Sequence, residues 1–235
     1  MLGTDGIPFG DVRLAVPSNF AETLAQINLD HLPNEANQFR YRFSLQRTRE
    51  EQAGSGSARF NNLSAYDTRL FSATWVRTFG ASLVNDMRLS YRRVNENYPV
   101  KEAAANVFPN IVVTSANFGI GPNQLLPQGT PVNNNYGIYD ALTYIRGNHN
   151  FKFGGEARRL ITSVYFLQNS RGYYDYSDLD QLLRDEAPAT NLRGAGNSSF
   201  AANNSRFAGF AQDDWKIMPS LTLNLGVRYE YTSAL

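Results

Sequence analysis

The chain of 235 residues contains no cysteine, which excludes a disulfide framework, an iron–sulfur cluster and a thiolate zinc site. Histidine is scarce, with two residues, His31 and His149. The motifs that mark zinc proteases, hydrolase nucleophile elbows and phosphate-binding loops do not occur in the sequence. We therefore expect no catalytic residues, no metal site and no cofactor, and the sequence indicates a protein that is not an enzyme.

Neither an excess of one charge nor a long apolar run is present. The 22 Lys+Arg residues face 21 Asp+Glu residues, whereas a nucleic-acid partner would require a clear basic excess. The longest uncharged stretch, from Ala103 to Tyr139, contains four prolines and seven asparagines. A membrane-spanning helix would not tolerate them. The N-terminal residues lack a basic segment followed by an apolar one, so no signal peptide is expected.

The pattern that the sequence does contain is alternation with a period of two. From Leu221 to Thr232, leucine, valine and tyrosine occupy every odd position. Because successive side chains of a strand point to opposite faces, this segment is predicted to be a strand with one apolar and one polar side. The same pattern, clear or weaker, predicts eight strands, at roughly residues 21–29, 39–48, 67–79, 84–97, 136–146, 150–167, 205–217 and 221–232.

The connections between these strands alternate between short and long. The long ones cover roughly residues 49–66, 98–135 and 168–204. Sorting of this kind is typical of an antiparallel up-and-down sheet threaded through a bilayer, with tight turns at the periplasmic edge and long loops outside. The predicted fold class is therefore all-β, a segment of about eight strands from a transmembrane β-barrel with long extracellular loops.

One short helix is expected inside the third long loop. Ser177 stands where it would cap the helix, and Asp180 follows three residues later as in a capping box. Leu179, Leu182 and Leu183 would form its apolar face.

The polar sides of the strands hold the most suggestive side chains. In a barrel these side chains would line the lumen, either as a polar passage or as a surface on which an internal plug rests. The alternative is that they only pair with one another to satisfy the interior. The candidates are Arg40, Arg42, Arg88, Arg92, Glu156, Arg158, Arg228 and Glu230. On the apolar sides, an aromatic girdle at the membrane boundary is expected from Trp75, Tyr91, Trp215, Tyr229 and Tyr231.

Two hairpin motifs carry a resemblance to a known family. Residues 147–156 read GNHNFKFGGE, and residues 212–230 read QDDWKIMPSLTLNLGVRYE. Both resemble hairpins of TonB-dependent receptors, in the branch of Oar-type proteins. The likeness covers most of residues 20–235, and its glycines at 154 and 155 would relieve crowding where a strand bends.

The resemblance implies an outer-membrane barrel of about 22 strands, plugged by an N-terminal domain and energised through TonB. Residues 1–235 would then be a partial barrel domain, because no plug domain or TonB box is found and eight strands cannot enclose a plug. The implied location is the outer membrane and the implied role is uptake of an unidentified ligand. Outer-membrane lipid is the expected partner of this segment, whereas a plug domain and TonB would be partners only in the full-length protein.

Two other interpretations stay open. One is a small, complete outer-membrane barrel with a structural or adhesion role. The other is a soluble β-rich module that binds glycans, for which the loop tyrosines would form the platform. In the receptor interpretation the same tyrosines, Tyr173, Tyr174 and Tyr176, are candidate ligand contacts of the long loops.

Overall fold

Eight long strands form one antiparallel sheet in a computed structural model that describes residues 10, 15–16, 18–54 and 56–233. The expectation that no signal peptide is present concerns N-terminal residues that lie outside the described ranges. Both ends of the predicted domain 1–235 also lie outside them. All eight predicted strands are confirmed, and several extend beyond their predicted bounds. They are β1 (Asn19–Asn34), β2 (Asn37–Gln52), β3 (Asn62–Phe79), β4 (Leu83–Tyr98), β7 (Gln128–Arg146), β8 (His149–Phe166), β12 (Asn204–Met218) and β13 (Leu221–Thr232).

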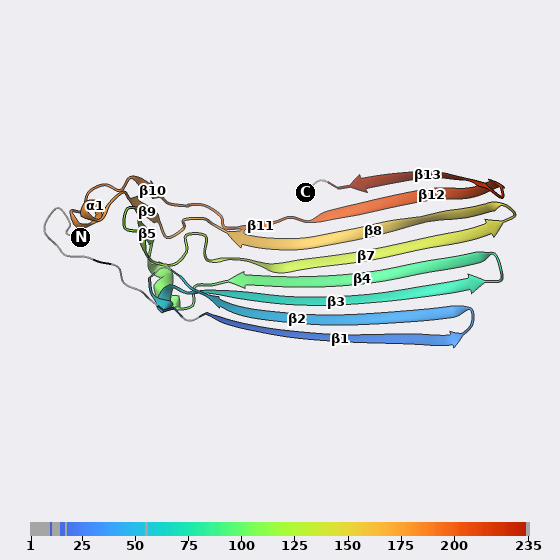
Figure 1. Cartoon of the computed structure of the whole chain (residues 1–235), viewed down its shortest axis with the longest axis horizontal. Helices are drawn as coiled ribbons and strands as arrows, with labels where there is room; N and C mark the ends of the chain where they lie inside the picture. The colour runs from blue at the N-terminus through green and yellow to red at the C-terminus, as the bar shows by residue number, and fades with distance from the viewer. Residues whose placement is uncertain (1–9, 11–14, 17, 55, 234–235) are drawn as a thin grey trace.

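The strands follow one another in chain order across the sheet, as an up-and-down meander (Figure 1). Tight turns join them at one end, and the three long connections gather at the opposite end (Figure 1). Gly80 and Gly147 occupy two of the tight turns with φ of 64° and 59°, a conformation that glycine adopts without steric cost. Within the described residues the sheet is open, with β1 and β13 as its edges, and so differs from a closed eight-stranded barrel.

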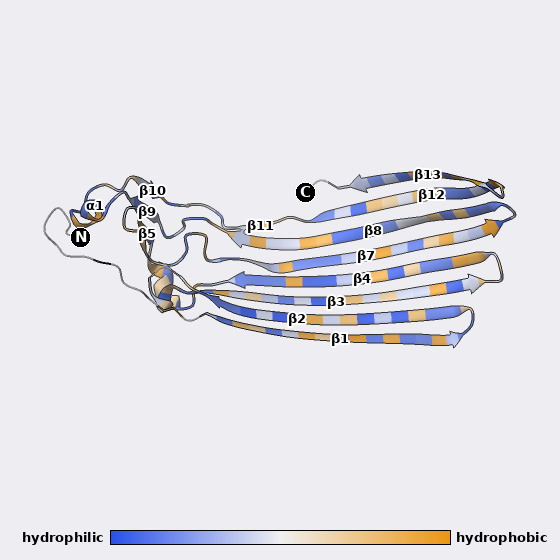
Figure 2. Cartoon of the chain, in the orientation of Figure 1, coloured by the Kyte–Doolittle hydropathy of each residue, from blue (hydrophilic) through white to orange (hydrophobic). Residues whose placement is uncertain are grey.

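The register of the strands divides the sheet into two faces. We call apolar face the side that carries Leu221, Leu223 and Leu225, and polar face the side that carries Asn224 and its cross-strand neighbours. Figure 2 shows the hydrophobic and hydrophilic residues alternating along the long strands. The predicted girdle residues Trp75, Tyr91, Trp215, Tyr229 and Tyr231 all lie on the apolar face.

The large side chains of the apolar face are exposed rather than packed in a protein core. Leu225 is 52% exposed, Val227 70% and Tyr229 72%. In the described part of the chain the buried hydrophobic residues are few, and most lie toward the long loops: Val94, Val100, Ala105, Val113, Leu126 and Ala141. Burial of apolar surface stabilises a fold, but the described residues do not bury this face. Its burial must therefore come from contacts with surroundings outside the chain. No helix in the described ranges is both long and apolar enough to cross a membrane.

The long loops fold into a smaller structure of their own, which we call the loop region (residues 53–61, 99–127 and 167–203). Its four short strands form a second sheet in the order β10–β9–β5–β6, in which β5 and β9 run parallel. The elements are two 3-10 turns, Ala58–Phe60 and Ala103–Val107, with β5 (Asn110–Val113), β6 (Phe118–Ile120), β9 (Tyr173–Tyr176), α1 (Leu179–Leu183), β10 (Thr190–Leu192) and β11 (Ser199–Ala201), which pairs with β8.

The predicted helix is confirmed, but its expected cap is wrong. The side chain of Asp178, rather than that of Ser177, accepts a hydrogen bond from the Gln181 backbone N–H at 2.8 Å. Gln181 in turn accepts one from the Ser177 backbone N–H, so that two N–H groups at the start of the helix are satisfied. Leu183, expected on the apolar face of the helix, is 52% exposed.

Candidate functional site

The eight predicted lumen residues all lie on the polar face, in four consecutive rows of cross-strand neighbours. One row contains Arg40, Arg88, Glu156 and Glu230. Arg42 and Arg158 share the next row toward the loops, Arg92 lies one row further, and Arg228 lies one row toward the turns. The structure therefore brings side chains from four different strands, β2, β4, β8 and β13, into one charged belt across four adjacent rows.

On the β8 and β13 side of this belt the charges are paired. Arg158 contacts Glu156, and Arg228 contacts Glu230. Arg228 also lies 3.7 Å from Glu156. On this side, the contacts agree with the interpretation that the charged side chains of the polar face pair with one another.

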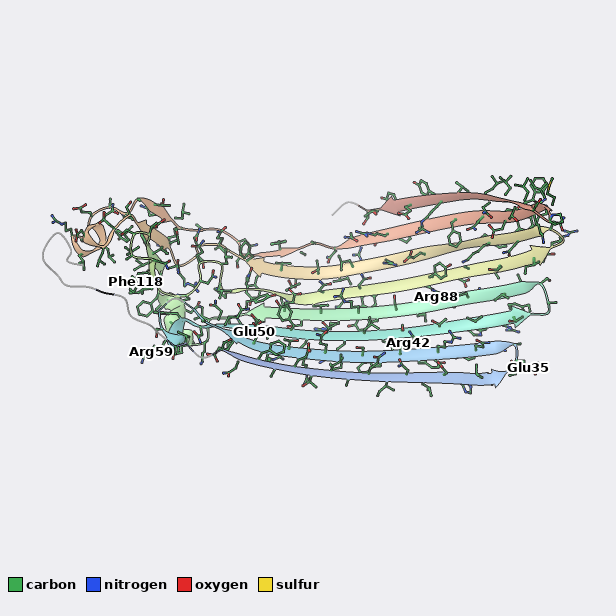
Figure 3. All side chains as sticks on the ribbon, viewed as in Figure 1. Glu35, Arg42, Glu50, Arg59, Arg88 and Phe118 are labelled. Atoms are coloured by element: carbon green, nitrogen blue, oxygen red, sulfur yellow. The ribbon has the colours of Figure 1, made fainter. Side chains whose placement is uncertain are left out.

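Near β2 the pairing is incomplete. The Arg88 guanidinium is held by Asp86, with Nε 2.9 Å from Oδ1. Arg42 and Arg88, labelled in Figure 3, come from β2 and β4 on either side of β3. Together with Arg40 they line a hollow of about 400 Å³, whose other polar walls are Ser72, Thr74 and Asp86. This hollow offers several donors and a single carboxylate, which suits an anionic group.

Aromatic rings connect the two ends of the charged belt. The Arg88 guanidinium lies 5.4 Å from the ring centre of Tyr139, and Arg228 lies 6.0 Å from that of Phe210. The two rings stack at 6.2 Å with an interplanar angle of 15°. The arginines are thereby held by cation–π contacts as well as by carboxylates.

The three candidate loop tyrosines lie in β9, in the interior of the loop sheet between β5 and β10. Tyr173, Tyr174 and Tyr176 are half-buried. Asp175 between them accepts a hydrogen bond from Thr114 Oγ1 at 2.8 Å, and burial together with the charge of Asp175 raises the pKa of the Tyr173 phenol. Their role in the structure is partly to hold the loop sheet, and a ligand would meet only part of each ring.

A pocket that the sequence analysis did not identify lies at the base of the loop region. Its volume is about 460 Å³, within the range of small-molecule sites, and no ionisable side chain lines it. The side-chain amides of Asn62, Asn110, Asn123 and Gln124, with Ala53 and Leu125, form its walls. Asn62 Oδ1 is buried and accepts no hydrogen bond from the described residues. We call this site the amide pocket.

Contacts between loops hold the amide pocket in place. Arg171, from the third long loop, donates to Asn106 Oδ1 at 2.7 Å and to the Asn123 carbonyl at 2.6 Å. The backbone N–H of Asn169 donates to the Gln124 carbonyl at 2.9 Å. Burial lowers the pKa of the Arg171 guanidinium, which nevertheless remains charged because an arginine is not deprotonated in proteins. The one available signal was the abundance of asparagine within the uncharged stretch.

A second feature that sequence reasoning missed is a histidine–aspartate contact on the apolar face near the tight turns. His149 Nδ1 lies 2.7 Å from Asp213 Oδ2, and the imidazole stacks between Phe151 at 5.3 Å and Trp215 at 5.2 Å. Asp213 pairs with Leu225, so it lies on the face opposite to Asp214. In the described residues no group of three His, Cys, Asp or Glu side chains could hold a metal ion.

Comparison with known proteins decides the family. Residues 10–235 match the model of a family described as an outer membrane beta barrel domain. The chain belongs to this outer-membrane β-barrel family. No curated protein matches the sequence.

Among solved structures, this outer-membrane β-barrel is similar to the outer membrane transporter YddB from Escherichia coli. The TM-score is 0.59 at 10% sequence identity, over 98% of this chain and 29% of the YddB chain. Such a likeness shows the fold. The chain thus spans less than a third of the transporter that it matches.

These findings confirm the predicted fold class and the predicted location. The chain is an all-β, antiparallel, up-and-down segment of an outer-membrane β-barrel. A soluble glycan-binding module is excluded by this location.

Proposed function

We propose that the chain forms part of the barrel of a TonB-dependent transporter of the Oar-type branch, which takes up a ligand across the outer membrane. Support comes from the two motifs at residues 147–156 and 212–230, which form the β7–β8 and β12–β13 hairpins. The hairpins lie side by side, because β8 pairs with β12. The related fold of YddB, described as an outer membrane transporter, agrees with this role.

The observation that carries the proposal is the convergence of the long loops on the amide pocket. A barrel that only serves as scaffold has no need of a polar pocket held by several loops, whereas a receptor gains affinity from a preorganised one. The first and second loops line the pocket and the third braces it through Arg171. In the transporter, the loops would capture the ligand above the polar face.

The chemistry of the pocket favours an uncharged ligand rich in hydroxyl groups. Asparagine and glutamine side chains both donate and accept hydrogen bonds, which suits neighbouring hydroxyl groups. An anionic ligand would leave its charge unpaired among amides, at a considerable cost. A peptide ligand would require more apolar surface than Ala53 and Leu125 provide.

In this proposal, the polar face lines the lumen and residues 1–235 supply barrel strands only. The plug domain and the remaining strands would belong to the full-length protein, where TonB is the energising partner. The hollow formed by Arg40, Arg42 and Arg88 would then face the plug or the passing ligand.

The test uses the full-length natural protein that contains this chain, produced in Gram-negative cells with and without TonB. Radiolabelled maltotriose is the neutral probe and a ferric siderophore is the charged comparator. We expect maltotriose uptake that stops without TonB and falls at least tenfold in the Asn62→Ala/Gln124→Ala variant. Asn191→Ala, an exposed amide of β10 outside the pocket, is the matched control and should transport normally. Uptake that persists without TonB would contradict the proposed mechanism of transport.

A further inference from the structure

Arginines replace apolar side chains on the apolar face where the strands approach the long loops. On β2 the series that ends at Leu45 continues with Arg47 and Arg49, and on β3 the residue beyond Phe71 on the same face is Arg69. Strands β4 and β8 continue in the same way. We call these five residues the arginine belt: Arg47, Arg49, Arg69, Arg93 and Arg159.

Two members of the belt repel each other within the sheet. Arg69 on β3 and Arg93 on β4 are direct cross-strand neighbours, and like charges in this position destabilise a sheet. Among the described residues neither guanidinium has a carboxylate within ion-pair distance. Their flanking neighbours in the same row are Leu45 and Asn134, which carry no charge. The fold therefore places two positive charges together without a counter-charge of its own.

The remaining belt residues do not supply that counter-charge. Asp67 is the one carboxylate between them, and it already lies 2.9 Å from Arg49 and 3.7 Å from Arg47. The next carboxylate along this face of β2, that of Glu51, is held by Lys101. Arg159 donates to a hydroxyl, Ser205 Oγ, at 2.8 Å. Five guanidinium groups therefore share one carboxylate.

On the opposite face of the same sheet, several arginines do have a carboxylate partner. There Arg88 is held by Asp86, Arg158 by Glu156 and Arg228 by Glu230. The hollow of the polar face also holds unpaired arginines, Arg40 and Arg42, but there Asp86 is among the walls, whereas no carboxylate lies within ion-pair distance of Arg69 and Arg93 in the described residues.

The position of the arginine belt along the strands indicates which group outside the chain supplies its counter-charge. One row from Arg69 and Arg93 toward the tight turns lie Phe71, Tyr91 and Tyr136, in the row that Arg159 shares, and the rings of the two tyrosines are 5.0 Å apart. Aromatic side chains of this kind mark the boundary between hydrocarbon and headgroups in membrane barrels. A group just beyond them on the lipid-facing side is at the depth of lipid headgroups, where phosphates lie.

We infer that the arginine belt, centred on Arg69 and Arg93, is a binding site for an anionic, phosphate-bearing lipid of the leaflet on the long-loop side. The planar guanidinium matches phosphate oxygens in a bidentate manner. A headgroup with two phosphates reaches both central arginines and relieves their repulsion. The acyl chains of the same lipid then lie against Phe71, Tyr91 and the apolar face below them.

The binding test uses the chain folded in uncharged dodecyl maltoside micelles. The probe is lipid A, a glycolipid with two phosphates, and the comparators are monophosphoryl lipid A, phosphatidylcholine and inorganic phosphate. We expect the affinity measured by native mass spectrometry to fall in the order of these four probes. Binding to lipid A should weaken at least tenfold in Arg69→Gln/Arg93→Gln. Lys152→Gln/Arg206→Gln removes the same charge from the polar face and should leave binding unchanged.

A folding control separates binding from stability. Because Arg69 and Arg93 repel each other, Arg69→Gln/Arg93→Gln should unfold in uncharged micelles at a temperature no lower than the unsubstituted chain. Arg69→Lys/Arg93→Lys keeps the charge but loses the bidentate geometry, and it should bind lipid A with intermediate affinity. Equal binding of lipid A by the glutamine variant would overturn the inference. So would inorganic phosphate binding as tightly as lipid A, because the site would then recognise a free ion rather than a lipid.

Discussion

The long sheet and the loop region of this chain are stabilised by different means. In the sheet, continuous backbone ladders join successive strands, but many large apolar side chains are exposed, and in the edge strand β13 every residue is exposed. In the loop region, Val113 is fully buried and Asn110 is 7% exposed. One region depends on its surroundings for the burial of its side chains, and the other builds a small core of its own.

This difference separates what is imposed by the membrane from what is particular to this protein. A lipid bilayer requires an apolar side chain at every second position of each strand of a membrane barrel, whatever the function of that barrel. The loop region is free of that requirement, and its polar residues form the amide pocket.

The largest expected effect tests the facing of the sheet. Val227 lies mid-strand on the apolar face and Asn224 lies on the polar face of β13. We expect Val227→Arg to destabilise the inserted state by about 2 to 4 kcal/mol, because an arginine would face mid-bilayer hydrocarbon. Asn224→Arg should have a mild effect. Equal free energies of folding into vesicles for the two variants would contradict the assigned faces.

A somewhat smaller effect is expected where two strands approach closely. A Cβ on Gly154 would overlap the Asp140 carbonyl oxygen and lie 2.9 Å from Ala141 Cα, whereas a Cβ on Gly209 would meet nothing within 4 Å. We therefore expect Gly154→Ala to cost about 1 to 3 kcal/mol through overpacking. Gly209→Ala is the matched control and should leave the urea midpoint of unfolding in lipid nearly unchanged. A similar shift in both variants would show that crowding does not explain the glycine.

The loop region should respond to its own core without affecting the sheet. Val113→Ala removes two methyl groups from a fully buried site, which costs about 1.5 kcal/mol. We expect faster hydrogen exchange in residues 110–120 and 173–176 and no change in insertion. Should β12 and β13 also exchange faster, the two regions would be coupled rather than separate.

The smallest expected effect concerns ionisation in the loop region. Burial and Asp175 raise the pKa of Tyr173, so its contribution to stability is fully present below the unfolded pKa of about 10. That contribution is lost as the pH rises through the higher folded pKa. A difference titration at 295 nm between the unsubstituted chain and Tyr173→Phe should place the midpoint above about 10. A midpoint at or below that value would mean that the ring is not shielded in the loop sheet.

The sequence predicts the sheet well because its determinants are local. The alternation from Leu221 to Tyr231 depends only on the period of the strand itself, and Gly80 and Gly147 each adopt a positive φ within a single turn. All eight lumen candidates follow from the same period, since a strand that keeps its register keeps its faces.

The loop region is much less predictable because its contacts are not local. The parallel pairing of Asn110 with Tyr173 joins two different loops, and no period in either loop indicates it. The same holds for Asp178, which replaces the expected cap, and for the four amides of the pocket, which come from separate segments. The arginine belt lay within the periodic pattern, but only the register shows that Arg69 faces Arg93.

The most direct test of the central claim, that the apolar face meets hydrocarbon, uses the two tryptophans of the chain. Trp75 and Trp215 lie on this face near the tight turns, at the expected depth of the interface. In vesicles of brominated phosphatidylcholine, we predict strong fluorescence quenching by bromine near the headgroup, weaker quenching by bromine near the chain ends, and little quenching by aqueous iodide. Trp75→Phe should reduce the signal without changing this order. Strong iodide quenching with no effect of brominated lipid would show that the apolar face lies in water or against protein, and would contradict the account.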